Sequence, residues 1–161
     1  MRTERSKKTM IAVQGRRISV FLAYACLAIA PSNANTPLDL NEFHGRVVYL
    51  DFWASWCAPC KQSFPWMNRM QREFGQDGFV VVAVNVDHVR PDAAQFLHEY
   101  SPGFKIVFDP DGAVAERFGV KGMPTSFLID RDGHVHSEHE GFRLKDRGAL
   151  EQQIRSLLAA Q

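Results

Sequence analysis

The residues best suited to chemistry are two cysteines in the run Trp56-Cys57-Ala58-Pro59-Cys60. An apolar, strand-like run precedes them and a helical pattern follows, so the pair is predicted to open a helix. Backbone N–H groups and the helix dipole at such a position favour a thiolate and lower a cysteine pKa from its ordinary value of ~8.5. Cys60, one turn further on, is close enough to form a disulfide with Cys57 and is expected to be the more buried. The pair predicts thiol–disulfide exchange in which Cys57 attacks and Cys60 resolves, with no cofactor.

The CxxC spacing alone leaves a metal site open, since zinc ribbons, ferredoxins and copper carriers use it too. Such sites need further thiolates or histidines, and the sequence has no second CxxC. His134 and His136 are predicted to share one strand face and could bind a metal with His139, although surface histidines explain them as well. A copper carrier that uses the CxxC therefore stays as the less favoured alternative, and no metal ligand is predicted.

One carboxylate interrupts the apolar run before the cysteines. Asp51 stands in Val47-Val48-Tyr49-Leu50-Asp51-Phe52-Trp53, where an ionised group is costly, so its pKa is expected to be raised. The alternative is a carboxylate at a strand end, held by a neighbour such as Lys61 or Lys105.

The pattern around these residues predicts an α/β domain. A buried strand over 47–53 leads into a helix whose apolar stripe is Phe64, Met67, Met70 and Phe74, with a kink or a shift of axis at Pro65. The later elements are a strand over 79–86, a helix over 92–100, a brief strand over 106–108, helical turns over 114–118, a hairpin of 125–130 and 134–140, and a helix over 143–160. The segment 35–45 could add an edge strand or simply pack through Leu38, Leu40 and Phe43. The order predicts a mixed sheet covered by helices on both faces.

The first residues differ in composition from all that follows. Basic residues up to Arg17 precede the uncharged apolar run 18–30, and Ser32-Asn33-Ala34 matches a small-x-small cleavage site. We expect a signal peptide over 1–34, cleaved after Ala34, and one globular domain over 35–161. An uncleaved membrane anchor formed by 18–30 remains the alternative, although that run is shorter than the roughly 20 residues of a spanning helix. The start could also be Met10.

Charge and cysteine count narrow the possible partners and folds. With 19 basic and 18 acidic residues the chain has a net charge of +1, which gives no argument for a nucleic-acid partner. Cys26 would leave with the leader, so the mature chain would hold only the CxxC pair. Two cysteines so close together cannot form the disulfide framework of a small secreted domain. We expect one domain and a monomer.

Two separated motifs resemble those of thioredoxins. The run from Asp51 to Lys61 resembles their active-site strand and loop, and the run from Gly119 to Thr125 resembles the loop that carries their cis-proline, at Pro124. The insertion over 86–118, together with Phe127-Leu128-Ile129-Asp130 and Gly133, is more similar to the exported TlpA/ResA-like branch. The resemblance implies a thioredoxin-like fold with a βα insertion between the CxxC helix and the cis-proline loop.

The resemblance also implies roles for particular residues. Asp51 would exchange a proton with the resolving cysteine, and the Met123–Pro124 bond would be cis. A client segment would contact Trp56, Ala58 and Pro59 and would pair with the backbone of Met123, next to Pro124. The clients would be disulfide-bearing exported proteins in the periplasm or another extracytoplasmic space. The electron donor would be a membrane thiol carrier of the DsbD/CcdA type.

Three features indicate whether the protein reduces or oxidises its clients and which biological role it has. Neither Ala58 nor Pro59 can donate a side-chain hydrogen bond to sulfur, so a disulfide reductase is expected, with a protein-disulfide oxidase or isomerase as the alternative. Exported relatives often carry asparagine in place of Asp51, and many carry glutamate in place of Ser63. Both departures favour a general reductase over a cytochrome-maturation factor.

Overall fold

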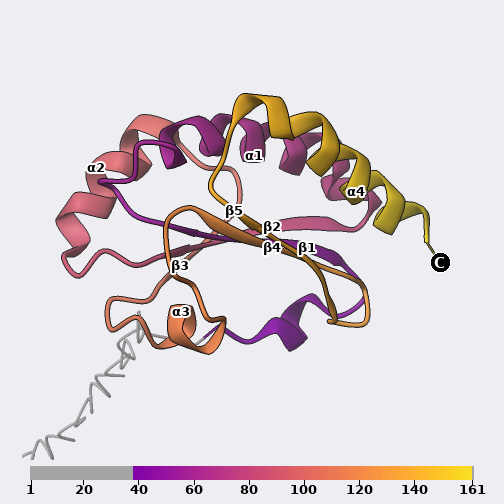
Figure 1. Cartoon of the computed structure of the whole chain (residues 1–161), viewed down its shortest axis with the longest axis horizontal. Helices are drawn as coiled ribbons and strands as arrows, with labels where there is room; N and C mark the ends of the chain where they lie inside the picture. The colour runs from indigo at the N-terminus through magenta and orange to yellow at the C-terminus, as the bar shows by residue number, and fades with distance from the viewer. Residues whose placement is uncertain (1–37, 161) are drawn as a thin grey trace, which may run out of the picture. The chain divides into compact units, whose positions relative to one another are not determined.

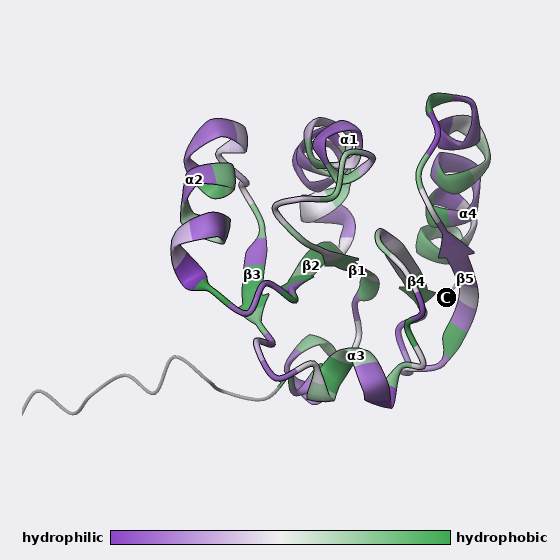
Figure 2. Cartoon of the chain, turned by 60° about the vertical axis from the view of Figure 1, so that its left-hand side comes forward, coloured by the Kyte–Doolittle hydropathy of each residue, from purple (hydrophilic) through white to green (hydrophobic). Residues whose placement is uncertain are grey.

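A mixed five-stranded sheet forms the centre of the computed structural model, which describes residues 38–160. The strands are β1 (Val47–Trp53), β2 (Phe79–Asn85), β3 (Lys105–Phe108), β4 (Thr125–Ile129) and β5 (Val135–Glu140). Their order is β3-β2-β1-β4-β5, with β1, β2 and β3 parallel and β4 antiparallel to both β1 and β5 (Figure 2). Every residue of β1 and β2 is buried, as their continuous apolar runs predict.

Helices cover both faces of this sheet, which confirms the predicted thioredoxin-like fold. Helices α1 (Cys60–Phe74), α2 (Arg90–Tyr100) and α4 (Arg147–Ala159) lie on one face, and α3 (Ala113–Arg117) lies on the other (Figure 1). Short 3₁₀ helices occupy Leu40–Phe43, Gly75–Asp77 and Leu144–Asp146. No helix among residues 38–160 has the length and apolar character needed to cross a membrane.

The alternation of side chains along β1 separates two hydrophobic cores. Tyr49 and Trp53 point toward α1, α2 and α4, whereas Leu50 and Phe52 point toward α3. Asp51 shares the face of Tyr49 and Trp53, because side chains two residues apart in a strand lie on the same side. The only carboxylate of β1 is therefore directed under α1, the helix that begins at Cys60.

Several predicted boundaries shift in the structure. The edge-strand interpretation of 35–45 is wrong for the described part, because Leu40–Phe43 is a 3₁₀ helix and Leu38 and Phe43 are buried against the α3 side. Helix α1 continues past Pro65, which is exposed. Helix α2 begins at Arg90 and α4 at Arg147, each a few residues from its predicted start. The signal peptide, the cleavage site and Cys26 lie outside the described residues.

Candidate active site

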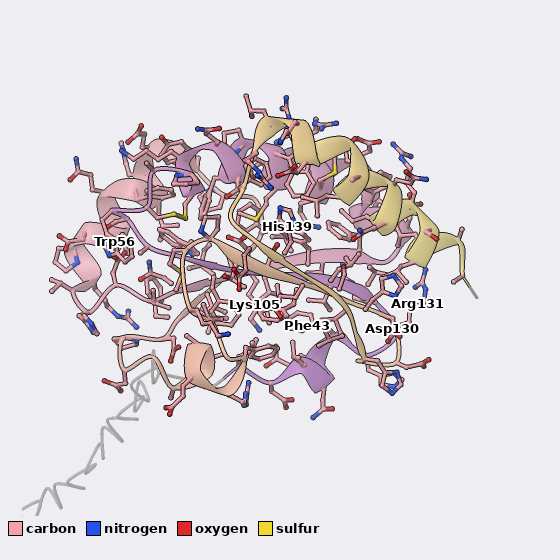
Figure 3. All side chains as sticks on the ribbon, in the orientation of Figure 1. Phe43, Trp56, Lys105, Asp130, Arg131 and His139 are labelled. Carbon is pink, nitrogen blue, oxygen red and sulfur yellow. A yellow bond between two sulfur atoms is a disulfide. The ribbon has the colours of Figure 1, made fainter. Side chains whose placement is uncertain are left out.

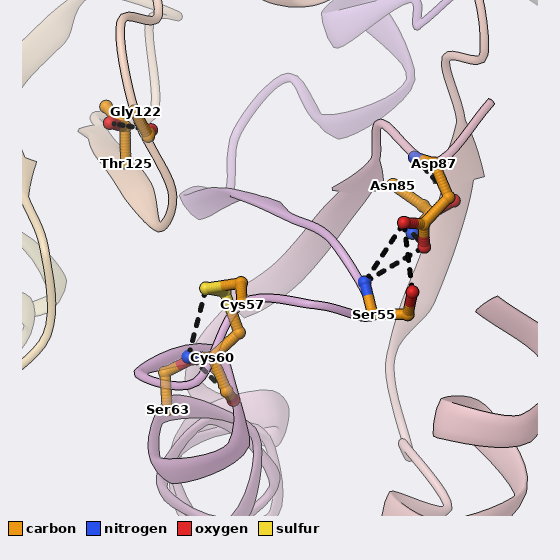
Figure 4. Close-up of a disulfide and its surroundings, with 8 residues drawn as sticks. All are labelled: Ser55, Cys57, Cys60, Ser63, Asn85, Asp87, Gly122 and Thr125. Atoms are coloured by element: carbon orange, nitrogen blue, oxygen red, sulfur yellow. Dashed lines mark hydrogen bonds between the residues drawn. A yellow bond between two sulfur atoms is a disulfide. The ribbon is translucent and has the colours of Figure 1, made fainter. Parts of the chain in front are cut away.

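Cys57 and Cys60 form a disulfide at the start of α1, with their Cα atoms 5.3 Å apart (Figure 4). Cys60 is the first residue of α1, and Cys57 lies in the turn before it. The Cys60 N–H donates a hydrogen bond to Cys57 Sγ at 3.2 Å, so a backbone donor of the helix start reaches the sulfur. Cys57 is 3% exposed and Cys60 0%. The expected order of burial holds, but the difference is small.

The loop before the cysteines is anchored to the end of β2 by the Asp87 carboxylate. Asp87 accepts hydrogen bonds from the backbone N–H and the hydroxyl of Ser55, and from Asn85 Nδ2 at 2.7 Å (Figure 4). The Asp87 N–H in turn donates to Asn85 Oδ1 at 3.3 Å. This network was not predicted from the sequence. Its signal is the pair of polar residues, Asn85 and Asp87, at the carboxyl end of an otherwise apolar strand.

The surface beside Cys57 is dominated by one aromatic ring, that of Trp56. Trp56 is 72% exposed, although it follows a strand and loop in which Trp53 and Ala54 are fully buried. Ala58 is exposed as well, and Pro59 is half-buried. A groove of about 270 Å³ separates Trp56 from helix α2. The side chains of Asp92, Phe96 and Glu99 line its far side.

The Met123–Pro124 peptide bond is cis, which confirms the prediction for this loop. The Pro124 carbonyl accepts a hydrogen bond from the Gly141 N–H at 2.7 Å, and the Thr125 hydroxyl donates to the Gly122 carbonyl at 2.8 Å. Met123 is half-buried against both cores, including the one that contains the cysteines. Within residues 38–160 its N–H and C=O make no backbone hydrogen bond. Both groups therefore lack a backbone partner within this range.

Asp51 is 1% exposed in the body of β1, and its Oδ2 has no hydrogen-bond partner among the described residues. Burial raises the pKa of this carboxyl well above its ordinary value, which confirms the predicted direction. The lysine alternative is wrong. Lys105 pairs with Glu42 and lies over the Phe43 ring on the α3 side of the sheet (Figure 3), and Lys61 is exposed.

Two hydroxyl groups accompany this carboxyl. The Tyr49 hydroxyl donates to Ser126 Oγ at 2.9 Å, and Ser126 is the register partner of Asp51 on β4. Burial raises the pKa of Tyr49, and the nearby Asp51 raises it further. This cluster was not predicted from the sequence, because Ser126 is brought beside Tyr49 and Asp51 only by the pairing of β1 with β4.

Two other predicted positions have ordinary contacts. Ser63 is fully buried, and its hydroxyl donates to the Cys60 carbonyl at 3.2 Å. The three histidines weighed as an alternative metal site do not share one face of the strand. Strand β5 begins at Val135, so His134 precedes it, and His136 and His139 lie on opposite faces of the strand. The ligand atoms that do come close belong to Asp130, Asp132 and His134, where Asp130 Oδ1 already accepts two backbone N–H groups.

The amino-acid sequence is similar to those of known proteins. The model of the family described as Redoxin matches residues 23–154. The chain belongs to the Redoxin family. The thiol-disulfide oxidoreductase ResA of Bacillus thuringiensis subsp. konkukian is 32% identical over 120 residues, which are 74% of this chain and 68% of the relative. ResA of Bacillus subtilis is 37% identical over 98 residues, which are 61% of this chain and 55% of the relative.

Solved structures of other proteins are similar to this chain over most of its length. A Chlorobium tepidum protein assigned as thiol:disulfide interchange protein DsbE is 56% identical, with a TM-score of 0.74 over 76% of this chain and 86% of that one. A protein from Neisseria meningitidis assigned as a thioredoxin is 26% identical, with a TM-score of 0.70 over 77% of this chain and 82% of that one. This member of the Redoxin family is a TlpA/ResA-like thiol–disulfide oxidoreductase with a CxxC pair.

Proposed function

We propose that this oxidoreductase reduces disulfides of exported proteins. The Cys57 thiolate attacks one sulfur of a client disulfide, which forms a mixed disulfide and releases the other client sulfur as a thiolate. Cys60 loses its proton and attacks Cys57 Sγ, which releases the second client thiolate. The client gains two electrons, and the enzyme is left with the Cys57–Cys60 disulfide seen in the structure.

The observation that carries the reducing direction is the hydrogen bonding of Cys57 Sγ. One donor reaches it within residues 38–160, the Cys60 N–H, and neither Ala58 nor Pro59 offers a side-chain donor. A strong oxidant needs a reduced form with a highly stabilised thiolate. A sulfur with one neutral backbone donor gains less stabilisation, and this supports a potential closer to thioredoxin than to DsbA.

The client is proposed to bind between Trp56 and the cis-proline loop. An extended client segment would pair with the open N–H and C=O of Met123, and Pro124 would bound the space beside the sulfurs. Trp56, with Ala58 and Pro59, would contact the client on the other side of the disulfide. Backbone pairing is insensitive to client sequence, so this mode suits a reductase with many clients.

Asp51 is proposed to accept the proton of Cys60. A buried carboxyl with a raised pKa and no ion-pair partner can hold a proton near neutral pH, which a surface aspartate cannot. Its position on the α1 side of β1, the side to which Cys60 belongs, supports this role.

The protein is proposed to act outside the cytoplasm and to be reduced again by a donor at the membrane. Residues 1–34 would direct export and be removed, which leaves 35–161 as a periplasmic or otherwise extracytoplasmic monomer, or residues 18–30 would anchor it. The reduced state would be restored by a membrane thiol donor of the DsbD/CcdA type. Intact mass of the exported product, in cells with and without such a donor, tests cleavage and reduction together.

The deciding experiment measures the equilibrium of the oxidised domain with glutathione. A potential near about −270 mV is expected, and a value near about −120 mV would instead establish an oxidase. In parallel, a Cys60→Ser variant should retain mixed disulfides with clients from the exported fraction. Cys57→Ser is the matched control and should retain none, since the attacking thiol is gone.

A further inference from the structure

One row of side chains crosses the whole sheet on the α1 and α4 side. In register order from β3 to β5 it consists of Ile106, Ala83, Asp51, Ser126 and His139. On one side of Asp51 the row is apolar, and on the other side each residue can exchange a proton. A proton on the Asp51 carboxyl therefore has polar neighbours in one direction only, toward the β5 edge.

Exposure increases along this polar half of the row. Asp51 is 1% exposed and Ser126 3%, whereas the side chain of His139 is 27% exposed. Directly opposed residues of antiparallel strands have Cβ atoms about 4.5–5.5 Å apart, a gap that side-chain polar atoms or one bridging water can span. Ser126 Oγ accepts the Tyr49 hydroxyl hydrogen, so the hydrogen of Ser126 itself is available to another acceptor.

His139 ends the row beside a charged group at the surface. Figure 3 shows His139 on the α4 side of the sheet. Its side chain is partly exposed, but its Nε2 is buried and has no hydrogen-bond partner among the described residues. The Asp146 Oδ2 lies 3.6 Å from this nitrogen. The Arg143 Nε donates to the same oxygen at 2.8 Å, and that hydrogen bond lowers the pKa of Asp146, with smaller contributions from His139 and Lys145. The Asp146 carboxylate thus lies next to the imidazole ring that ends the row.

We propose that Ser126 and His139 carry protons between the Asp51 carboxyl and solvent, along the sheet and away from the disulfide. The inference rests on the proposed role of Asp51. When Cys60 is deprotonated, its proton moves to the Asp51 carboxylate. Asp51 then protonates Ser126 Oγ, the hydrogen of Ser126 passes to His139, and the imidazolium releases a proton to solvent beside Asp146. No electron moves in this route, and each group returns to its starting state.

The route has a clear use in the catalytic cycle. While a client covers the disulfide and the cis-proline loop, the active-site end of the sheet is closed to solvent. A second exit through His139 allows Asp51 to lose its proton before the client has left. Ser126 and His139 act through Asp51 and are therefore proton-relay residues, which do not touch the sulfurs.

The test follows resolution of the mixed disulfide of Cys57 with glutathione. Reduced full-length protein is mixed with excess oxidised glutathione, so that formation of the mixed disulfide does not limit the rate, and tryptophan fluorescence reports closure of the Cys57–Cys60 disulfide. We expect His139→Ala to slow this step about tenfold or more near neutral pH. The His136→Ala variant is the matched control and should be unaffected, because His136 lies on the opposite face of the same strand.

Two further readouts separate proton transfer from a structural effect. Added imidazole should restore the rate of His139→Ala, and its equilibrium with glutathione should equal that of the wild type. Ser126→Ala should be slowed as well, but without rescue by imidazole. A wild-type rate in His139→Ala, or a slow rate that imidazole does not restore, would overturn the relay.

Other results would refute the proposed function itself and not only the relay. If Asp51→Asn resolves the mixed disulfide at the wild-type rate, both the role of Asp51 and the relay are wrong. If Asp51→Asn is slow while His139→Ala is not, only the relay is wrong. If the wild-type protein does not close its own disulfide, the thiol cycle itself is refuted.

Discussion

The Asp87 carboxylate binds Ser55 twice, through the backbone N–H at 3.0 Å to Oδ2 and through the hydroxyl at 3.1 Å to Oδ1. Asp87 is 6% exposed and stands just beyond the end of β2, whereas Ser55 lies two residues before Cys57. The position of Cys57 therefore depends on a contact between Ser55 and a side chain 32 residues further along the sequence.

Removing this carboxylate should loosen the active-site loop. Asp87→Ala leaves the Ser55 N–H and Asn85 Nδ2 without their acceptor, so we expect the free energy of unfolding to fall by about 1–3 kcal/mol. Urea denaturation of the oxidised protein measures this. Hydrogen exchange at the Ser55 amide should also accelerate. Asp92→Ala, an exposed aspartate of α2, is the control and should change neither. An unchanged midpoint in Asp87→Ala would contradict the anchoring role.

Asp51 should make the oxidised protein less stable as the pH rises. Its pKa is raised in the folded state, so its stabilising contribution is complete below the unfolded pKa of about 3.9 and is lost as the pH rises through the folded value. Asp51→Asn cannot ionise, and its advantage over the wild type should grow between pH 4 and pH 8 by about 1–3 kcal/mol. Urea denaturation of the disulfide form at both pH values avoids titrating thiols.

The control for this measurement is Asp77→Asn, since Asp77 is exposed. Its stability relative to the wild type should not vary with pH in the same range. An Asp51→Asn advantage that is equal at both pH values would mean that Asp51 titrates normally in the folded protein.

Trp56 should matter for protein clients and not for folding. Because its ring is 72% exposed, Trp56→Ala should leave the free energy of unfolding within about 0.5 kcal/mol of wild type. Loss of an aromatic contact worth about 1.4 kcal/mol should reduce the rate with insulin about tenfold and leave the rate with oxidised glutathione unchanged. Val135→Ala, at an apolar position 53% exposed, is the control. Equal losses with both substrates would argue against client contact.

Backbone pairing of a client with the cis-proline loop should change the hydrogen exchange of the Met123 amide. The Met123 amide makes no backbone hydrogen bond within the described chain, so it should exchange quickly in the free protein. It should become protected when a cysteine peptide is trapped on Cys57 in the Cys60→Ser variant. The Gly141 amide, already bonded to the Pro124 carbonyl, should be protected in both states. A Met123 amide that still exchanges quickly in the trapped complex would rule out backbone pairing.

Local sequence was sufficient for the parts of the site that lie within a single motif. The continuous apolar run of β1, the CxxC at the start of α1 and the Gly122-Met123-Pro124 approach each carry their own signal, and each has the predicted form. Asp51 was also predictable, because a carboxylate inside an apolar run signals burial before any fold is known. Its expected lysine partner was wrong, since sequence does not say which face of a sheet a distant lysine occupies.

Contacts that depend on strand pairing and register could not be predicted from the sequence. Ser126 reaches Tyr49 only because β4 pairs with β1, and His139 aligns with Ser126 only because β5 pairs with β4. The histidines differ from expectation for a simpler reason: β5 begins at Val135, after His134, and His136 and His139 are three residues apart and lie on opposite faces.

The two outer strands of the sheet affect how the protein behaves among unfolded chains. Strand β5 carries exposed His136, Glu138 and Glu140, and β3 begins with exposed Lys105. Charged side chains on an outer strand discourage stacking of foreign strands against it, and with it aggregation. If the proposed clients reach the protein before they are folded, these charged edges would disfavour pairing of client strands with the sheet.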